Sequence, residues 1–171
     1  ACDTPSKLQQ QYVNLPAVLT APSRILTICR DLLQHYSSQI QPNGGKAMLV
    51  ARSRRAAVLY HMTLRALSAP AAACVISARS GDPASYLGYT NLQEQQQAIE
   101  QFRDPAHPLS ILIVKDMLLT GFDAPVCQVM YLDKRMQAHA LLQAITRVNR
   151  PGPGKQQGYI VDYVGLAAEL S

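Results

Sequence analysis

The feature that most constrains the fold is a short apolar run that leads into a glycine-containing turn. Residues 110–114, Ser-Ile-Leu-Ile-Val, are apolar after the serine and rich in β-branched side chains, which is typical of a central strand covered on both faces of a parallel sheet. The segment KDMLLTGFDAP follows directly at 115–125. Because ligands of open α/β sheets bind outside the carboxyl ends of strands, we expect Thr120, Gly121 and Asp123 to lie where a nucleotide or a nucleic-acid backbone approaches.

The chemistry of these three turn residues suits such a ligand. Gly121 permits a close approach of the main chain to the ligand, and Thr120 offers a hydroxyl group and an N–H to a phosphate. Asp123 is able to accept a hydrogen bond from a ribose hydroxyl or to hold an arginine. The same residue types also form ordinary polar turns, so the segment alone does not establish a site.

A second segment, QAITRVNR at 143–150, places polar groups on one face of a helix. Gln143, Arg147 and Arg150 share that face at spacings of i, i+4 and i+7. Four apolar residues are expected to turn towards a core: Leu141, Leu142, Ile145 and Val148. Arg150 precedes a proline, which disfavours helical geometry, so we expect its guanidinium group to reach beyond the helix end.

Two interpretations of these arginines stand at this point. A guanidinium is always charged and offers a planar fork of donors, which suits a phosphoryl oxygen. An arginine pair projected into another lobe's ATP site would serve as an arginine finger. Alternatively, cations in a last helical turn offset the helix dipole by about 0.3–1 kcal/mol each, with no ligand involved.

The sequence as a whole predicts alternating helices and strands. After a leader or linker at 1–21, helices are expected at 22–40, from the cap Ser53 to 67, and from the cap Asn91, with Glu94, to 102, followed later by the arginine-bearing helix. Strands are expected between and after these helices, at 46–51, 73–78, 110–115, 127–133 and 159–162. A loop is expected at 79–90. This alternation predicts one α/β domain at 22–171 with a mostly parallel sheet and right-handed crossovers. The loop at 79–90 is longer than most connections, so it is expected to be mobile or to contact DNA or a neighbouring domain.

The composition is compatible with nucleic-acid binding but is not diagnostic of it. The formal net charge is +5 and the apolar fraction is 48 %, enough for one core and a mildly basic surface. Arg52, Arg54 and Arg55 lie where the strand 46–51 gives way to the next helix, and we expect them to reach backbone phosphates. Positive charge at a helix amino end is unfavourable and favours a bound anion, although a solvated first turn has the same sequence pattern.

Several classes of site and location are not indicated. The cysteines at positions 2, 29, 74 and 127 include no C-x-x-C pair, and the four histidines lack metal-ligand spacing, so neither a metal site nor a disulfide framework is predicted. No run approaches the roughly 18 apolar residues of a membrane helix, and the amino end is polar. A cytoplasmic location without membrane insertion is therefore expected.

Four segments in this order, DMLLTGFDAP, CQVMYLD, LLQAITRVNR and GYIVDYVG, are similar to the restriction (R) subunits of type I restriction enzymes, which are superfamily 2 translocases. The first and third segments resemble motifs V and VI of that family, and QAITRVNR fits the pattern Q-x-x-[GT]-R-x-x-R. Upstream, GKAMLVARSRRAAVLYHMTL at 45–64 resembles the strand and helix that open the second RecA-like lobe and carry motif IV. The resemblance covers about residues 22–165.

The resemblance implies a RecA-like three-layer αβα fold and specific roles for the motif residues. These roles put Gly121 and Asp123 near the nucleotide, Arg147 and Arg150 at the γ-phosphate, Gln143 as an organiser of the same site, and Thr120 near the DNA backbone. ATP with Mg²⁺ is then bound mainly by a first lobe. The implied partners are duplex DNA, the first lobe and nuclease domain of the same subunit, and the modification and specificity subunits.

The sequence lacks the other half of such a motor. It contains no G-x-x-x-x-G-K-[ST] loop, no DEAD- or DEAH-type tetrad and no nuclease-like acidic pair with a lysine. We therefore expect the second motor lobe of an ATP-dependent type I site-specific deoxyribonuclease, inactive on its own. The rivals are the second lobe of another superfamily 2 helicase acting on RNA or repair intermediates, and a non-catalytic docking module whose arginines pair with carboxylates such as Asp123 or Asp162.

Overall fold

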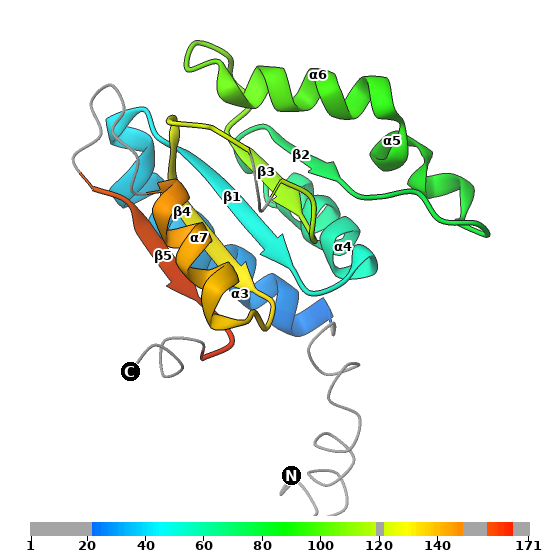
Figure 1. Cartoon of the computed structure of the whole chain (residues 1–171), viewed down its shortest axis with the longest axis horizontal. Coiled ribbons are helices and arrows are strands. Elements are labelled where there is room, and N and C mark those ends of the chain that lie inside the picture. The colour runs from blue at the N-terminus through cyan, green and yellow to red at the C-terminus, as the bar shows by residue number, and fades with distance from the viewer. Residues whose placement is uncertain (1–21, 119–121, 149–156, 166–171) are drawn as a thin grey trace, which may run out of the picture.

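The protein forms a parallel sheet covered on both faces. The computed structural model describes residues 22–118, 122–148 and 157–165, so the predicted leader at 1–21 lies outside the described residues. Five strands pair in the order β2-β3-β1-β4-β5, and every pair is parallel (Figure 1). Their bounds are β1 Lys46–Ala51, β2 Ala72–Val75, β3 Ile111–Val114, β4 Cys127–Asp133 and β5 Tyr159–Asp162. The predicted parallel α/β sheet is confirmed.

Two of the helices, α4 and α6, begin after the capping residues that the sequence indicated. Their bounds are α3 Pro22–His35, α4 Arg54–Ala66, α5 Leu87–Thr90, α6 Leu92–Arg103 and α7 Ala138–Val148. The Ser53 hydroxyl accepts a hydrogen bond from the Ala56 N–H at 3.0 Å. The Asn91 side chain accepts one from the Glu94 N–H at 3.1 Å. Each cap satisfies a helix N–H that has no partner within its own helix.

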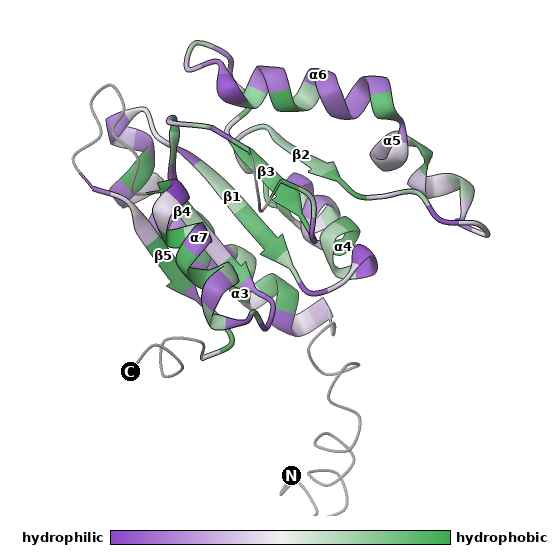
Figure 2. Ribbon diagram, viewed as in Figure 1, coloured by the Kyte–Doolittle hydropathy of each residue, from purple (hydrophilic) through white to green (hydrophobic). Residues whose placement is uncertain are grey.

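Side chains alternate between the two faces of the sheet and create two apolar layers. Leu49 packs in the first layer, which lies beneath α3 and α4. Its neighbours Met48 and Val50 pack in the second layer, which contains Phe102 of α6 and residues of α7. The strands are accordingly the most uniformly apolar elements in Figure 2, and α6 shows polar turns on its outer side. This is the expected three-layer αβα arrangement.

Several boundaries differ from the sequence prediction by one residue, the short helix α5 lies within the predicted loop at 79–90, and two boundaries differ by more. The first helix is α-helical only to His35 and continues as a π-type turn at Tyr36–Ile40 before Gly44, with φ of 72°, ends it. β2 was expected to extend to residue 78 but ends at Val75, because the next N–H, that of Ile76, donates to the carbonyl of Tyr89 instead of to a neighbouring strand. The chain therefore leaves the sheet earlier than its apolar character predicted.

The connection from β3 to β4 positions the TGFDAP segment. Both strands are parallel, so the chain must return from the carboxyl end of β3 to the amino end of β4, and its described part does so without a helix. Phe122 and Ala124 are buried in the same apolar layer as α6 and α7, and the rings of Phe122 and Phe102 stack with centroids 6.3 Å apart. This segment covers the sheet where a crossover helix would otherwise pack.

None of the helices within the described residues is long and apolar enough to cross a membrane. The described cysteines Cys29, Cys74 and Cys127 are buried free thiols. Burial raises the pKa of both Cys29 and Cys74 to about 12, so these thiols stay protonated and unreactive at neutral pH.

Candidate functional site

Helix α7 presents the motif residues on the outer side of the second layer. Leu141, Ala144 and Val148 are buried against the sheet, while Gln143 is exposed and Arg147 is partly buried. The expectation that Leu142 faces the core is wrong, because its side chain is 54 % exposed. The burial follows i, i+3 and i+7 from Leu141, which turns Leu142 away from the sheet.

Asp123 lies at a different end of the sheet from the one expected. Three residues later, the carbonyl of Val126 accepts from the N–H of Lys46, the first residue of β1, at 3.0 Å. Asp123 is therefore closer to the amino ends of the strands than to their carboxyl ends. The reason is topological. Asp123 belongs to the connection between the parallel strands β3 and β4, which returns the chain from the carboxyl end of β3 to the amino end of β4, and Asp123 lies in the last part of that connection.

This placement brings Asp123 to the same face and end of the sheet as Arg147. Helix α7 begins after the carboxyl end of β4 and leads to the parallel strand β5, so its last turn, which carries Arg147, lies towards the amino ends of the strands. Asp123 is exposed, and its segment packs in the same layer as α7. Thr120, Gly121 and Arg150 lie outside the described residues.

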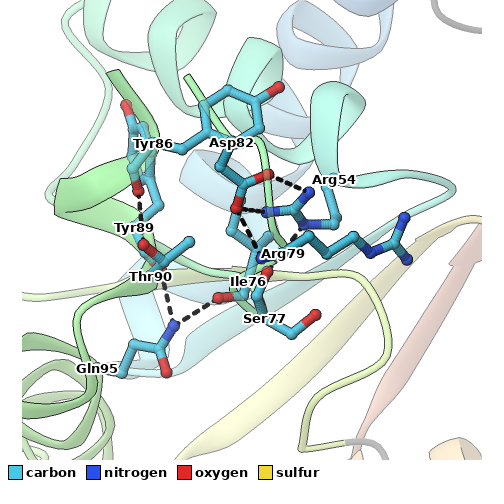
Figure 3. A network of polar contacts seen from close by, with 9 residues as sticks. All are labelled: Arg54, Ile76, Ser77, Arg79, Asp82, Tyr86, Tyr89, Thr90 and Gln95. Carbon is cyan, nitrogen blue, oxygen red and sulfur yellow. Dashed lines mark hydrogen bonds and ion pairs between the residues drawn. The ribbon is translucent and has the colours of Figure 1, made fainter. Parts of the chain in front are cut away.

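At the carboxyl ends of the strands Arg54, predicted to contact DNA, makes several contacts within the protein. Its Nε donates to the Ser77 carbonyl at 2.9 Å, its Nη1 donates to Asp82 at 2.8 Å, and its Nη2 forms an ion pair with the second oxygen of the same carboxylate (Figure 3). Three of its five N–H donors are therefore directed at groups within the protein, and Asp82 compensates its charge. The sequence did not reveal this pairing, because Asp82 lies 28 residues further along the chain.

The other two predicted arginines keep uncompensated charge at this edge. Arg55 is exposed, and Arg52 is partly buried with an Nη1 that has no hydrogen-bond partner among the described residues. Arg52 lines a cavity of about 640 Å³ at the carboxyl ends of β1, β4 and β5. Three further cationic side chains line the same cavity: Arg24, Lys134 and Arg135. Asp133 also lines the cavity, so four cationic side chains stand against one carboxylate, and this excess of positive charge favours an anionic ligand.

The lining of this cavity includes a buried carboxylate, that of Asp133, for which no role was predicted from the sequence. Asp133 at the end of β4 has no exposed area, and both of its oxygens meet Arg24, at 2.9 and 3.0 Å. The Tyr60 hydroxyl donates to it at 2.5 Å. Burial, followed by the negative charge of Asp133, raises the pKa of Tyr60, so the hydroxyl remains a donor. An aspartate that ends the apolar strand CQVMYLD was the available signal.

A second carboxylate, that of Asp116, holds the start of the connection between β3 and β4 to the chain beyond β4. Asp116 pairs with Lys115 at 2.9 Å and with Lys134, whose Nζ also donates to the Lys115 carbonyl at 3.2 Å. Burial, and then the nearby charge of Lys115, lowers the pKa of Lys134. The segments after β3 and β4 are thereby joined at the carboxyl edge.

The described residues thus offer two separate polar surfaces and no preformed metal centre. One surface carries Asp123, Gln143 and Arg147 on the second layer, and the other is the arginine-rich carboxyl edge. No group of three or more histidine, cysteine, aspartate or glutamate side chains within the described residues is arranged to hold a metal ion. Each surface carries at least one guanidinium group, a donor suited to phosphate oxygens, and the carboxyl edge carries several.

Comparison with known proteins identifies relatives of this chain. A family model described as Type I restriction enzyme subunit R domain 3 matches residues 84–165. The type I restriction enzyme MjaIXP endonuclease subunit of Methanocaldococcus jannaschii is 36 % identical over 172 residues, which cover 99 % of this chain and 16 % of that protein. The HindI endonuclease subunit of Haemophilus influenzae is 38 % identical over 166 residues, which cover 90 % of this chain and 16 % of that protein. The chain therefore spans about a sixth of these relatives.

Solved structures share the fold at low sequence identity. A fragment of an HsdR subunit of a type I restriction enzyme from Vibrio vulnificus YJ016 superimposes with a TM-score of 0.70 at 18 % identity, covering 90 % of this chain and 29 % of that chain. The C-terminal part of the Fun30 ATPase domain gives 0.58 at 14 % identity, with coverages of 82 % and 42 %. The type ISP restriction-modification enzyme LlaBIII bound to DNA gives 0.51 at 18 % identity, with coverages of 68 % and 8 %. The fold is the RecA-like α/β fold of these neighbours.

Proposed function

Because the chain belongs to the R-subunit family of type I restriction enzymes, we propose that it is the second motor lobe of such a subunit, in which ATP hydrolysis moves duplex DNA. The R subunit would act together with its first lobe, its nuclease domain, and the modification and specificity subunits. The Fun30 ATPase domain has the same fold, so the fold alone does not distinguish restriction enzymes from other ATPases. The assignment to the R-subunit family therefore depends on the sequence relatives.

The observation that carries the proposal is the position of Asp123 and Arg147 on one face and at one end of the sheet. A nucleotide held by a first lobe against this face would meet a carboxylate, an amide from Gln143 and a guanidinium. Arg147, with Arg150, would stabilise the charge that develops on the γ-phosphate, an effect of roughly three to five powers of ten in rate. ATP and Mg²⁺ would be bound mainly by the first lobe.

The carboxyl edge supports a DNA-binding role for a second surface of the same lobe. Arg52 and Arg55 follow β1 and make no ion pair among the described residues. Uncompensated arginines suit the phosphate backbone, which carries no sequence information, so the choice of DNA site would lie with the specificity subunit. LlaBIII, whose structure shares this fold, is bound to DNA. Thr120 would add a contact from the TGFDAP segment.

ATP hydrolysis by the isolated chain tests whether the lobe is half of an active site. We expect no turnover in Mg²⁺ at low salt, with or without duplex DNA, because the sequence contains no P-loop to hold the phosphates. Phosphate release would be followed at micromolar chain concentrations, with an intact R subunit as the positive control. DNA-stimulated turnover by the chain alone would require a complete site within these residues and would overturn the half-site proposal.

A further inference from the structure

We infer that Arg79 is a further contact for the DNA backbone, and that Arg54 and Asp82 form a brace that positions it. This inference rests on the proposed DNA-moving function and adds a contact from the connection between β2 and α6. From the sequence, this connection was expected to be a long loop, and no role was predicted for Arg79. The structure instead holds it at two points, one near its base and one at its tip.

The base of the connection is closed by a buried glutamine of α6. The side-chain Nε2 of Gln95 donates to the carbonyl of Ile76 at 2.6 Å and to the carbonyl of Tyr89 at 2.7 Å (Figure 3). Gln95 is only 4 % exposed, so the two bonds are shielded from water. They fix the points where the chain leaves β2 and where it approaches α6, since broken bonds would leave buried polar groups unsatisfied.

The tip of the connection is held by the brace. The side chains of Arg54 and Asp82 are 11 % and 18 % exposed, and their contact uses both carboxylate oxygens. The Arg54 guanidinium also lies over the ring of Tyr86, 5.4 Å from its centroid. A two-pronged arginine–carboxylate contact of this kind fixes orientation as well as distance. The tip is therefore tied to the first turn of α4.

The brace acts directly on the backbone of Arg79. The Arg79 N–H donates to Asp82 at 2.8 Å, and the Asp82 N–H donates back to the Arg79 carbonyl at 3.3 Å. Gly81 completes this tight turn with φ of 82°, a value that favours glycine. The Arg79 side chain is exposed and extends away from the ion pair (Figure 3). A fixed backbone with a projecting guanidinium lowers the ordering cost of a phosphate contact.

The position of Arg79 points to DNA phosphate as the ligand. Within the described residues Arg79 makes no ion pair, as is also true of Arg52 and Arg55. These arginines follow β1 and β2, two parallel strands separated by β3 alone. They therefore lie along the carboxyl ends of the strands, on the same side of the sheet. A row of uncompensated guanidinium groups along an edge fits the repeated charge of a nucleic-acid backbone better than it fits a single small anion.

The salt dependence of DNA binding tests the role of Arg79. In an R subunit that contains this chain, Arg79→Ala should weaken binding of labelled duplex DNA by about tenfold at 0.1 M salt, measured by fluorescence anisotropy. The slope of log K against log salt should fall by about one, equally for two unrelated DNA sequences. Arg65→Ala removes an exposed arginine from the last turn of α4, away from this edge, and should leave both quantities unchanged.

The sign of the effect of Asp82→Asn tests the brace separately. General electrostatics predicts that removing a carboxylate near DNA strengthens binding, whereas the brace predicts weaker binding because Arg79 loses its fixed position. Arg54→Lys, which retains the charge but loses the planar fork, should also weaken DNA binding. Tighter or unchanged binding by Asp82→Asn, in a variant that keeps the wild-type melting temperature, would overturn the brace.

The two proposals fail in different ways. If the wild-type R subunit shows neither salt-dependent DNA binding nor DNA-stimulated ATP hydrolysis, the motor proposal fails and takes the inference about Arg79 with it. If the wild-type subunit shows both, and Arg79→Ala keeps the wild-type affinity and salt slope, only the inference about Arg79 is overturned.

Discussion

At the scale of single residues, buried charge is the feature that most limits which substitutions this domain tolerates. Asp133 has no exposed area, and its charge is balanced by Arg24 from α3 together with a hydrogen bond from Tyr60 of α4. Arg24 also donates to the carbonyl of Tyr163, beyond β5, at 3.2 Å. One carboxylate therefore connects two helices, the end of β4 and the end of β5.

Removing Arg24 should consequently destabilise the whole domain. Arg24→Ala leaves Asp133 charged and buried with one remaining hydrogen bond, a change that typically costs about 3–5 kcal/mol. The free energy of unfolding would be measured in urea at pH 7. Arg30→Ala, at an exposed position on the same helix, should change it by less than about 0.5 kcal/mol. Equal effects of the two substitutions would mean that the ion pair contributes nothing to stability.

Single residues also mark the limit of inference from sequence. The spacing of Gln143 and Arg147 was sufficient to place both on the outer side of α7. The pairing of Arg54 with Asp82 was not predictable, because the two are brought together only when the connection after β2 folds against α4. Residues that are distant in sequence produce no periodic pattern when they pair. The sequence alone therefore does not distinguish a charged residue that binds a ligand from one that forms an internal ion pair.

At the scale of elements, boundaries were predictable where the local signal and the tertiary contacts agree. β1, β4 and β5 have the predicted bounds, because each apolar run is flanked by turn residues or charges. β2 is shorter than its apolar run, because a long-range bond from Ile76 to Tyr89 takes over from the sheet. The segment at 115–126 was predicted to contribute to a site, and its position as the connection between β3 and β4 required knowledge of the strand order.

The capping of α6 gives a quantitative prediction at this scale. Asn91→Ala removes the acceptor for the Glu94 N–H and should lower the free energy of unfolding by about 1 kcal/mol. Gln96→Ala, an exposed substitution within the same helix, serves as the control and should be neutral or slightly stabilising, since alanine is the better helix former. If the two variants unfold at the same urea concentration, the cap contributes nothing measurable.

At the scale of the whole molecule, the fold separates two surfaces that a motor needs to couple. The surface proposed to face the nucleotide lies over the second layer, towards the amino ends of the strands, and the arginine-rich edge lies at the carboxyl ends. The segment at 115–126 runs from one to the other, since it starts beside Asp116 at the carboxyl edge and passes Asp123 before β4. It provides a direct structural connection between the two proposed binding surfaces.

The rate of ATP hydrolysis by an R subunit carrying Arg147→Ala shows whether this lobe completes the ATP site. We predict that kcat falls by roughly three to five powers of ten while the affinity for ATP changes by only a few fold, because the arginine acts on the transition state. Arg147→Lys should remain impaired, since lysine lacks the planar donor fork, and Arg65→Ala should match the wild type. A kcat for folded Arg147→Ala within about tenfold of the wild-type value would contradict the account, because this lobe would then not complete the ATP site.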